Sequence, residues 1–188
     1  DIKFNEEKPI FITDNQKFIF DKVVIACGAF SKRLTDNLDE KIPLDTERGY
    51  HVRINDADVD LRIPVISGDY RFGVSNLSSG FRVAGTAELA SPNAPPNYDR
   101  ADRLVGLAKR MFPNLNADGY KRWMGCRPST PDSLPVICKS TECENAFFAF
   151  GHGHLGLTMA GITSEFILDL MEGNAPRIDI SGLHYRRF

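Results

Sequence analysis

One stretch decides the fold class: Asn145-Ala-Phe-Phe-Ala-Phe-Gly-His-Gly-His-Leu-Gly156, in which an apolar run leads directly into a glycine-rich turn. The apolar residues 145–150 predict a buried strand. After the turn, the apolar spacing of residues 157–171 predicts a packed helix that ends at Gly173. The segment therefore predicts a strand, a turn and a helix in sequence.

The turn at residues 151–156 literally matches the GxGxxG pattern of dinucleotide-binding proteins. That fingerprint requires a complete βαβ unit of about 30 residues, with an acidic residue about 20 positions further on. Pro176 and the short run at residues 177–180 stand where its second strand would be, so a nicotinamide nucleotide is not expected. Glycines nevertheless let a ligand approach the backbone, and the N–H groups at a helix start carry partial positive charge. We therefore expect an electron-rich ligand at this turn.

The sequence before this segment predicts two regions of different composition. The first contains two short strands joined by a hairpin turn, a buried strand that ends at Gly28, and a short helix, over residues 10–13, 17–20, 22–27 and 29–38. The second alternates short strand-like segments with turn residues, which predicts an antiparallel sheet over residues 49–54, 63–67, 70–74 and 80–86.

A helix and a stiff loop are predicted between the antiparallel region and the glycine turn. Apolar residues recur at helical spacing over residues 101–112, and Pro113 stops the helix. Residues 124–135 contain three prolines, at positions 128, 131 and 135. Proline is excluded from helix interiors and central strands, so this segment is predicted to be a rigid loop.

The net charge and the cysteine spacing exclude several classes of protein. The 23 Lys and Arg residues against 25 Asp and Glu give a net charge of −2, so obligate nucleic-acid binding is not expected. The four cysteines show no CxxC spacing, which predicts neither a disulfide framework nor a zinc site and favours a cytoplasmic location. The sequence starts at Asp1 without a signal segment, and we expect a chain that is cut at its front.

Several segments carry a family resemblance: residues 23–31, Arg48-Gly-Tyr50, residues 82–89, Gly125-Cys-Arg-Pro-Ser-Thr-Pro-Asp132 with the following Ser-Leu-Pro135, and residues 151–158. In this order they resemble the D-amino acid oxidase-like family of FAD-dependent flavoproteins, and its D-amino acid dehydrogenase branch most. The Arg-Pro block followed by the Gly-His-Gly turn is the specific part of the match.

The resemblance implies a two-domain α+β and α/β enzyme, in which an antiparallel substrate domain interrupts a Rossmann-like FAD domain. Residues 1–44 would belong to the FAD-binding domain, residues 45–122 to the substrate-binding domain, and residues 123–188 to the return into the FAD-binding domain. The family's own GxGxxG motif lies near its N-terminus, outside this sequence. We therefore expect a C-terminal fragment that is inactive on its own and does not hold FAD tightly.

The resemblance also implies oxidative deamination of D-amino acids to 2-oxo acids and ammonia, by hydride transfer to the flavin. Arg127 would bind the substrate carboxylate, because a guanidinium group offers two parallel donors to two oxygens. Tyr50 and His154 are further candidates at the substrate. The residues expected at the cofactor are Gly28, Gly153, His154, Leu155, Gly156, Leu157 and Thr158.

Alternatives remain open at the sequence level. For His152 and His154 a structural hydrogen bond is as reasonable as a contact with flavin or substrate. A glycine or sarcosine amine oxidase of the same family would show the same motifs, and a nucleotide-binding module without chemistry is the alternative from another class. For the dehydrogenase, the expected electron acceptor is a membrane quinone or the respiratory chain. That expectation places the enzyme in the cytoplasm, with peripheral attachment to the inner membrane.

Overall fold

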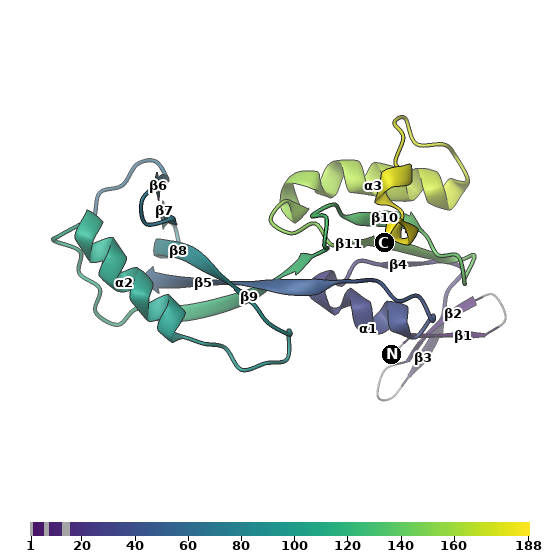
Figure 1. The fold of residues 1–188 in the computed structure, drawn as a ribbon, viewed down its shortest axis with the longest axis horizontal. Helices are drawn as coiled ribbons and strands as arrows, with labels where there is room; N and C mark the ends of the chain where they lie inside the picture. Colours follow the sequence, from purple (N-terminus) through teal and green to yellow (C-terminus); the bar gives the residue numbers. More distant parts are fainter. Residues whose placement is uncertain (1, 6–7, 13–15) are drawn as a thin grey trace. The chain divides into compact units, whose positions relative to one another are not determined.

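The structure is a computed structural model, and it describes residues 2–5, 8–12 and 16–188. The chain divides into two compact units (Figure 1): unit 1 comprises residues 1–46 and 127–188, and unit 2 comprises residues 47–126. Strands β5 (Asp45–Ile54) and β9 (Lys121–Ser129) carry the chain across the two boundaries. The resemblance placed these boundaries after residues 44 and 122.

Unit 1 is built around a three-stranded sheet with the order β10-β11-β4. Strand β11 (Ala146–Phe150) pairs in parallel with β4 (Val23–Ile25) and antiparallel with β10 (Val136–Lys139). The two apolar runs that predicted buried strands form β4 and β11. Strand β11 is covered on both faces, as is normal for a strand in a parallel pair, which explains why its run does not alternate with polar residues. In β4, Val23 and Ile25 are buried but Val24 is 36% exposed, so the prediction of a buried strand is wrong at this position.

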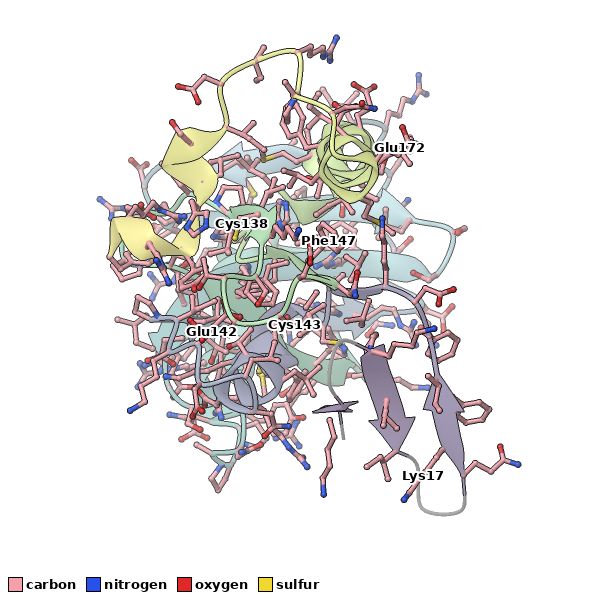
Figure 2. The ribbon with its side chains drawn as sticks, turned by 90° about the vertical axis from the view of Figure 1, so that its right-hand side faces the viewer. Lys17, Cys138, Glu142, Cys143, Phe147 and Glu172 are labelled. Atoms are coloured by element: carbon pink, nitrogen blue, oxygen red, sulfur yellow. The ribbon has the colours of Figure 1, made fainter. Side chains whose placement is uncertain are left out.

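The two faces of this sheet have separate cores. On one face, Phe147 packs with Phe166 and Ile167 of helix α3 (Gly156–Glu172). On the other face, Phe148 and Cys138 pack with Leu38, and helix α1 (Ser31–Asp36) follows a short 3-10 helix, η1 (Gly28–Phe30). Figure 2 shows Phe147 and Cys138 within these layers.

The ends of the unit 1 elements agree with the local sequence. Gly173 caps α3 in the left-handed conformation with a φ of 79°, as its position after the apolar pattern predicted. Two short 3-10 helices close the chain, η2 (Ser181–Leu183) and η3 (Tyr185–Arg187). An antiparallel sheet of β1 (Ile2–Asn5), β2 (Lys8–Ile12) and β3 (Lys17–Ile19) opens it, and most of the turn predicted at residues 14–16 lies outside the described residues.

Unit 2 contains a five-stranded sheet with the order β6-β7-β8-β5-β9. Strands β6 (Val65–Ser67), β7 (Phe72–Leu77), β8 (Gly80–Leu89) and β5 pair antiparallel, as predicted. Helix α2 (Asp99–Met111) buries Ala101, Leu104 and Ala108 in the same core as Val52 and Val83 of the sheet. The face of the sheet opposite this core carries half-buried polar side chains.

The prediction of a loop over residues 124–135 is wrong for its first half. Strand β9 continues through Arg127 and Pro128 to Ser129. Strand β9 lies at the end of the strand order, and proline is tolerated in an edge strand because the missing N–H faces no partner. Among residues 2–5, 8–12 and 16–188, no helix is both long enough and apolar enough to cross a bilayer.

Candidate active site

The glycine turn and Gly28 lie at the same edge of the unit 1 sheet. Strands β4 and β11 are parallel, so their carboxyl ends meet at one edge. Gly28 follows β4 with a φ of 55°, and apart from its chain neighbours no described residue has an atom within 4 Å of the position its Cβ would take. Ligands of open α/β sheets bind outside the carboxyl ends of the strands, which makes this edge the candidate site of unit 1.

Two glycines of the turn have backbone conformations that other residues rarely adopt. Gly151 has a φ of 81°, and a Cβ there would come within 3.0 Å of Thr130 Cγ2. Gly153 has a φ of 52° with open space around it. The Gly153 N–H donates a hydrogen bond of 2.8 Å to the Pro128 carbonyl oxygen, so the turn is tied to the end of β9.

The start of α3 is left open to a ligand. The helix has no side-chain cap and no acidic residue in its first turn. Its first N–H groups, at Gly156, Leu157 and Thr158, therefore present partial positive charge that no acidic side chain of that turn neutralises. Leu155 and Leu157 are exposed apolar side chains at the same place, with 93% of Leu157 accessible. An electron-rich, flat and partly apolar group suits this surface.

Arg127 stands beside the glycine turn, and its charge has no partner among residues 2–5, 8–12 and 16–188. It directly precedes Pro128, whose carbonyl accepts from Gly153. The residue is half-buried, and among the described residues its guanidinium group forms no ion pair. A half-buried arginine without a counter-ion is a suitable group for binding the carboxylate of a ligand.

The loop after Arg127 is held by hydrogen bonds as well as by prolines. Thr130 Oγ1 donates to the Leu134 carbonyl at 2.7 Å. Asp132 accepts two hydrogen bonds from Arg187, at 2.6 Å from Nε and 3.2 Å from Nη2. The Arg187 hydrogen bonds lower the pKa of Asp132 to about 2. The C-terminal end of the chain thus anchors the segment that follows Arg127.

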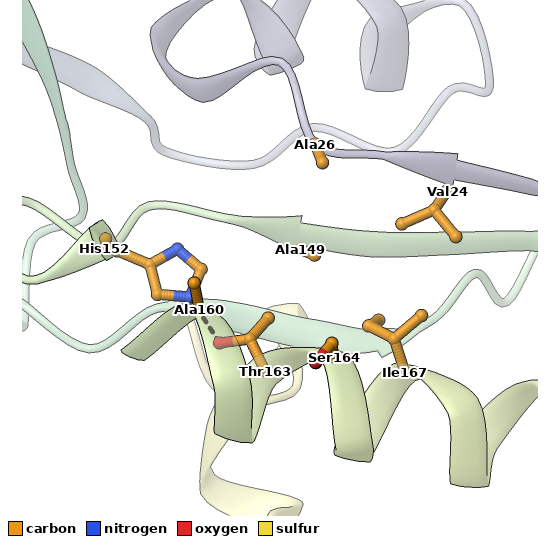
Figure 3. A pocket seen from close by; sticks show the side chains of 9 residues that line it. Val24, Ala26, Ala149, His152, Ala160, Thr163, Ser164 and Ile167 are labelled. Carbon is orange, nitrogen blue, oxygen red and sulfur yellow. Dashed lines mark hydrogen bonds between the residues drawn. The ribbon is translucent and has the colours of Figure 1, made fainter. Parts of the chain in front are cut away.

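His152 has a structural hydrogen bond and His154 lies on the surface. His152 Nε2 lies 3.0 Å from Thr163 Oγ1 of α3 (Figure 3), and burial lowers the pKa of His152. The neutral imidazole thus joins the turn to the helix. His154 is exposed, and its contact with substrate or cofactor stays a prediction.

A cavity of about 440 Å³ lies between the sheet and α3. Figure 3 shows its lining, which is mostly small or apolar: Val24, Ala26, Ala149, His152, Gly156, Ala160, Thr163, Ser164 and Ile167. It adjoins the open start of α3 through Gly156 and His152. Its walls offer apolar surface where the helix start offers N–H donors.

Tyr50 belongs to unit 2 and is 1% exposed. Its hydroxyl is bonded to Glu88 Oε2 and accepts a hydrogen bond of 3.0 Å from the Asn97 N–H. Arg48, which is fully buried, donates to the Pro95 carbonyl at 3.0 Å and lies 3.7 Å from Glu88. Tyr50 therefore serves to hold the loop before α2, and a substrate contact by its hydroxyl stays a prediction.

The structure brings Arg127, Gly28 and residues 151–158 together within unit 1. The Pro128 carbonyl, which links them, was missed because the sequence predicted a loop there. A further group in unit 2, His51, Arg53 and Arg82, was also missed. Alternation along β5 could have placed His51 and Arg53 on one face, whereas the position of Arg82 opposite Arg53 depends on the register between β5 and β8. Among the described residues, no cluster of histidine, cysteine or acidic side chains has the arrangement of a metal site.

A family model and the sequences of known proteins both relate the chain to one protein family. Residues 3–170 match the protein family described as DAO, FAD dependent oxidoreductase. A D-amino-acid oxidase of Bradyrhizobium diazoefficiens is 37% identical over 181 residues, which cover 94% of this chain and 43% of that protein. A D-amino acid dehydrogenase of Chromohalobacter salexigens is 34% identical over 173 residues, covering 89% of this chain and 41% of that protein. The chain thus spans less than half the length of these relatives.

Solved structures share the fold. Glycine oxidase from Geobacillus kaustophilus has a TM-score of 0.85 at 22% identity, covering 100% of this chain and 51% of that chain. L-proline dehydrogenase from P. horikoshii has a TM-score of 0.79 at 19% identity, covering 100% and 52%. At these identities the likeness concerns the arrangement of helices and strands.

Proposed function

The chain belongs to the DAO family of FAD dependent oxidoreductases, and from this premise we propose that it forms the C-terminal part of an enzyme that deaminates D-amino acids oxidatively. The products are the 2-oxo acid and ammonia. The D-amino-acid oxidase and the D-amino acid dehydrogenase described above support this substrate class, because each is more than 30% identical over most of the chain.

Within this proposal, unit 1 is part of the FAD-binding domain and unit 2 is the substrate-binding domain. The open start of α3 and the exposed glycine turn fit a flavin, whose edge carries electron-rich oxygen and nitrogen atoms. The N–H groups of Gly156, Leu157 and Thr158 would hold that edge, and Gly28 and Gly153 would let it approach. FAD, when bound, accepts the hydride from the substrate.

The observation that carries the proposal is the guanidinium group of Arg127 beside the glycine turn, which forms no ion pair in the part of the chain that the structure describes. A bidentate hydrogen bond to the substrate carboxylate would fix the position of the Cα–H bond. The hydrogen bond from Gly153 N–H to the Pro128 carbonyl ties Arg127 to the turn, so substrate and cofactor groups are held by one rigid segment. No side chain is assigned as a base, because the substrate ammonium group can lose its proton to solvent.

We further propose that the enzyme is a dehydrogenase that passes electrons to a membrane quinone or another carrier of the respiratory chain. This places the enzyme in the cytoplasm at the inner membrane. Turnover of the full-length enzyme with D-alanine and D-proline, measured under oxygen and with an artificial acceptor, separates the dehydrogenase from an oxidase. Glycine and sarcosine in the same assay test the alternative amine oxidase.

Substitution of Arg127 tests the site itself. In the full-length enzyme, Arg127→Ala is expected to lower kcat/KM for D-amino acids by at least about 100-fold, mainly through KM, since two charge-assisted hydrogen bonds are lost. Arg127→Lys should recover part of the loss. Lys121→Ala, an exposed change on the same strand, serves as the control. Unchanged kinetics in Arg127→Ala would remove Arg127 from the site, and absence of turnover with every D-amino acid would refute the substrate class.

A further inference from the structure

Two arginines face each other on the sheet of unit 2. Arg53 of β5 is the direct cross-strand partner of Arg82 of β8. Their neighbours Val52 and Val83 are fully buried in the core under α2, so Arg53 and Arg82 point to the opposite face. Directly opposed side chains on an antiparallel pair have Cβ atoms only about 5 Å apart.

The positive charge of this pair is not neutralised within unit 2. Among the described residues, neither guanidinium group forms an ion pair with a carboxylate. The Nε atoms of Arg53 and Arg82 are also buried without a hydrogen-bond partner. Like charges directly opposite one another destabilise a sheet, and buried donors without acceptors add to that cost. An anion bound between the two guanidinium groups would offset the repulsion between their charges.

His51 lies on the same face, beside the pair. Its ring stacks on Trp123 with 4.6 Å between the ring centroids, and its Nδ1 is buried without a partner. Burial and the positive charges of Arg82 and Arg53 lower the pKa of His51 to about 4. His51 is therefore neutral near pH 7 and contributes no opposing charge. Half of the Trp123 side chain remains exposed, with 50% of its surface accessible.

We propose that Arg53, Arg82 and His51 form a binding site for a small carboxylate ligand, with the Trp123 ring as a platform for the ligand's apolar part. Two guanidinium groups offer parallel donors that match carboxylate oxygens. Unit 2 alone provides this site, and its existence does not depend on the proposed function. The carboxylate can come from a free dicarboxylate or from the side chain of an acidic amino-acid substrate, and the latter source rests on the proposed function.

Calorimetric titration of the full-length protein with succinate tests the site directly. Succinate should bind the unmodified protein, and Arg82→Gln and Arg53→Gln should each weaken binding at least about tenfold, since each removes charged donors. Arg82→Lys should retain part of the affinity. Arg62→Gln is the control, because the side chain of Arg62 is 89% exposed and its ion pair with Asp60, at 3.8 Å, lies on the surface. Thermal unfolding of each variant reports whether it is folded.

Two results would overturn the proposal. Absence of succinate binding to the unmodified protein would mean that another part of the full-length protein neutralises the two arginines. Equal affinity in the unmodified protein and both glutamine variants would place any bound succinate elsewhere.

A kinetic comparison then separates the two sources of the carboxylate. If the ligand is a substrate side chain, Arg82→Gln lowers kcat/KM for D-aspartate about tenfold or more and leaves D-alanine nearly unchanged. If succinate binds through the two arginines while both substrates respond equally to the substitution, the ligand is a free dicarboxylate. An enzyme without activity on any D-amino acid would refute the proposed function, whereas the titration would still decide the carboxylate site.

Discussion

Replacement of Tyr50 by phenylalanine separates a structural role from a catalytic one. The Tyr50 hydroxyl is bonded to the Glu88 carboxylate and accepts from the Asn97 N–H at 3.0 Å. Burial and the hydrogen bond to Glu88 raise the pKa of Tyr50, so the phenol keeps its proton near pH 7 and donates to the carboxylate. Tyr50→Phe removes both hydrogen bonds and keeps the ring in place.

The size of the effect follows from these two bonds. A hydrogen bond to a charged group contributes about 1.5–3 kcal/mol, and a neutral one contributes about 1 kcal/mol. Glu88 keeps two other partners, Arg48 at 3.7 Å and Arg100 at 3.5 Å, which reduces the penalty at the carboxylate. We therefore expect a total loss of about 2–3 kcal/mol in the local stability of the loop before α2.

Hydrogen exchange of the Asn97 amide measures this local stability without assuming two-state unfolding of a large enzyme. A loss of about 2–3 kcal/mol corresponds to exchange about 30 to 150 times faster. The kcat/KM of the full-length enzyme should stay within about threefold of its original value, since the hydroxyl stabilises a loop rather than a substrate. Tyr70→Phe, at an exposed tyrosine, should change neither quantity.

The opposite pattern would refute this assignment. A fall in kcat/KM of about 100-fold or more, with unchanged exchange at Asn97, would show that the Tyr50 hydroxyl acts on the substrate. The hydrogen bonds to Glu88 and Asn97 would then contribute little to the loop.

Two further predictions concern the segments around Arg127. Because hydrogen bonds from Arg187 hold the pKa of Asp132 near 2, below its ordinary 3.8, the pair stabilises the fold above pH 4 and loses this contribution between pH 4 and 2. Arg187→Met should therefore lower the urea midpoint at pH 6, with a difference from the unmodified protein that shrinks as the pH falls from 4 to 2. A remainder persists at pH 2, because Arg187 also donates to the Leu134 carbonyl at 2.7 Å and this bond does not titrate. A difference that stays constant between pH 6 and pH 2 would contradict the ion pair. Gly151→Ala should destabilise the protein by about 1–2 kcal/mol, because alanine is strained at a φ of 81° and its Cβ would approach Thr130. The matched change Gly161→Ala, inside α3 with open space around it, should be neutral or stabilising in the same urea titration.

The local sequence pattern was sufficient to predict the helices and strands whose apolar residues follow a regular spacing. The apolar runs of β4 and β11 and the apolar stripe of α2 define their structure through residues close in sequence. Gly173 marked the end of α3 because a left-handed cap follows from the local backbone alone. Gly28 and the glycine turn were assigned to one cofactor through the family resemblance, and the parallel pairing of β4 and β11, which places both at one sheet edge, came from the structure.

The features that the sequence did not predict depend on pairing between strands that are distant in the sequence. Pro128 was compatible with β9 only because that strand is an edge, and sequence pattern does not reveal strand order. A register shift between Gly49 and Tyr50 determines which side chains of β5 face the core.

The sequence by itself therefore determined the family, the main helices and strands, and the presence of Arg127 next to a proline. Tertiary structure alone decided that Tyr50 is enclosed by Glu88 and Asn97, and that Arg53 and Arg82 meet without a counter-ion from the described residues of unit 2. The physical reason is that periodicity reports which residues share a face within one strand, whereas the charge balance of a site depends on the register between strands.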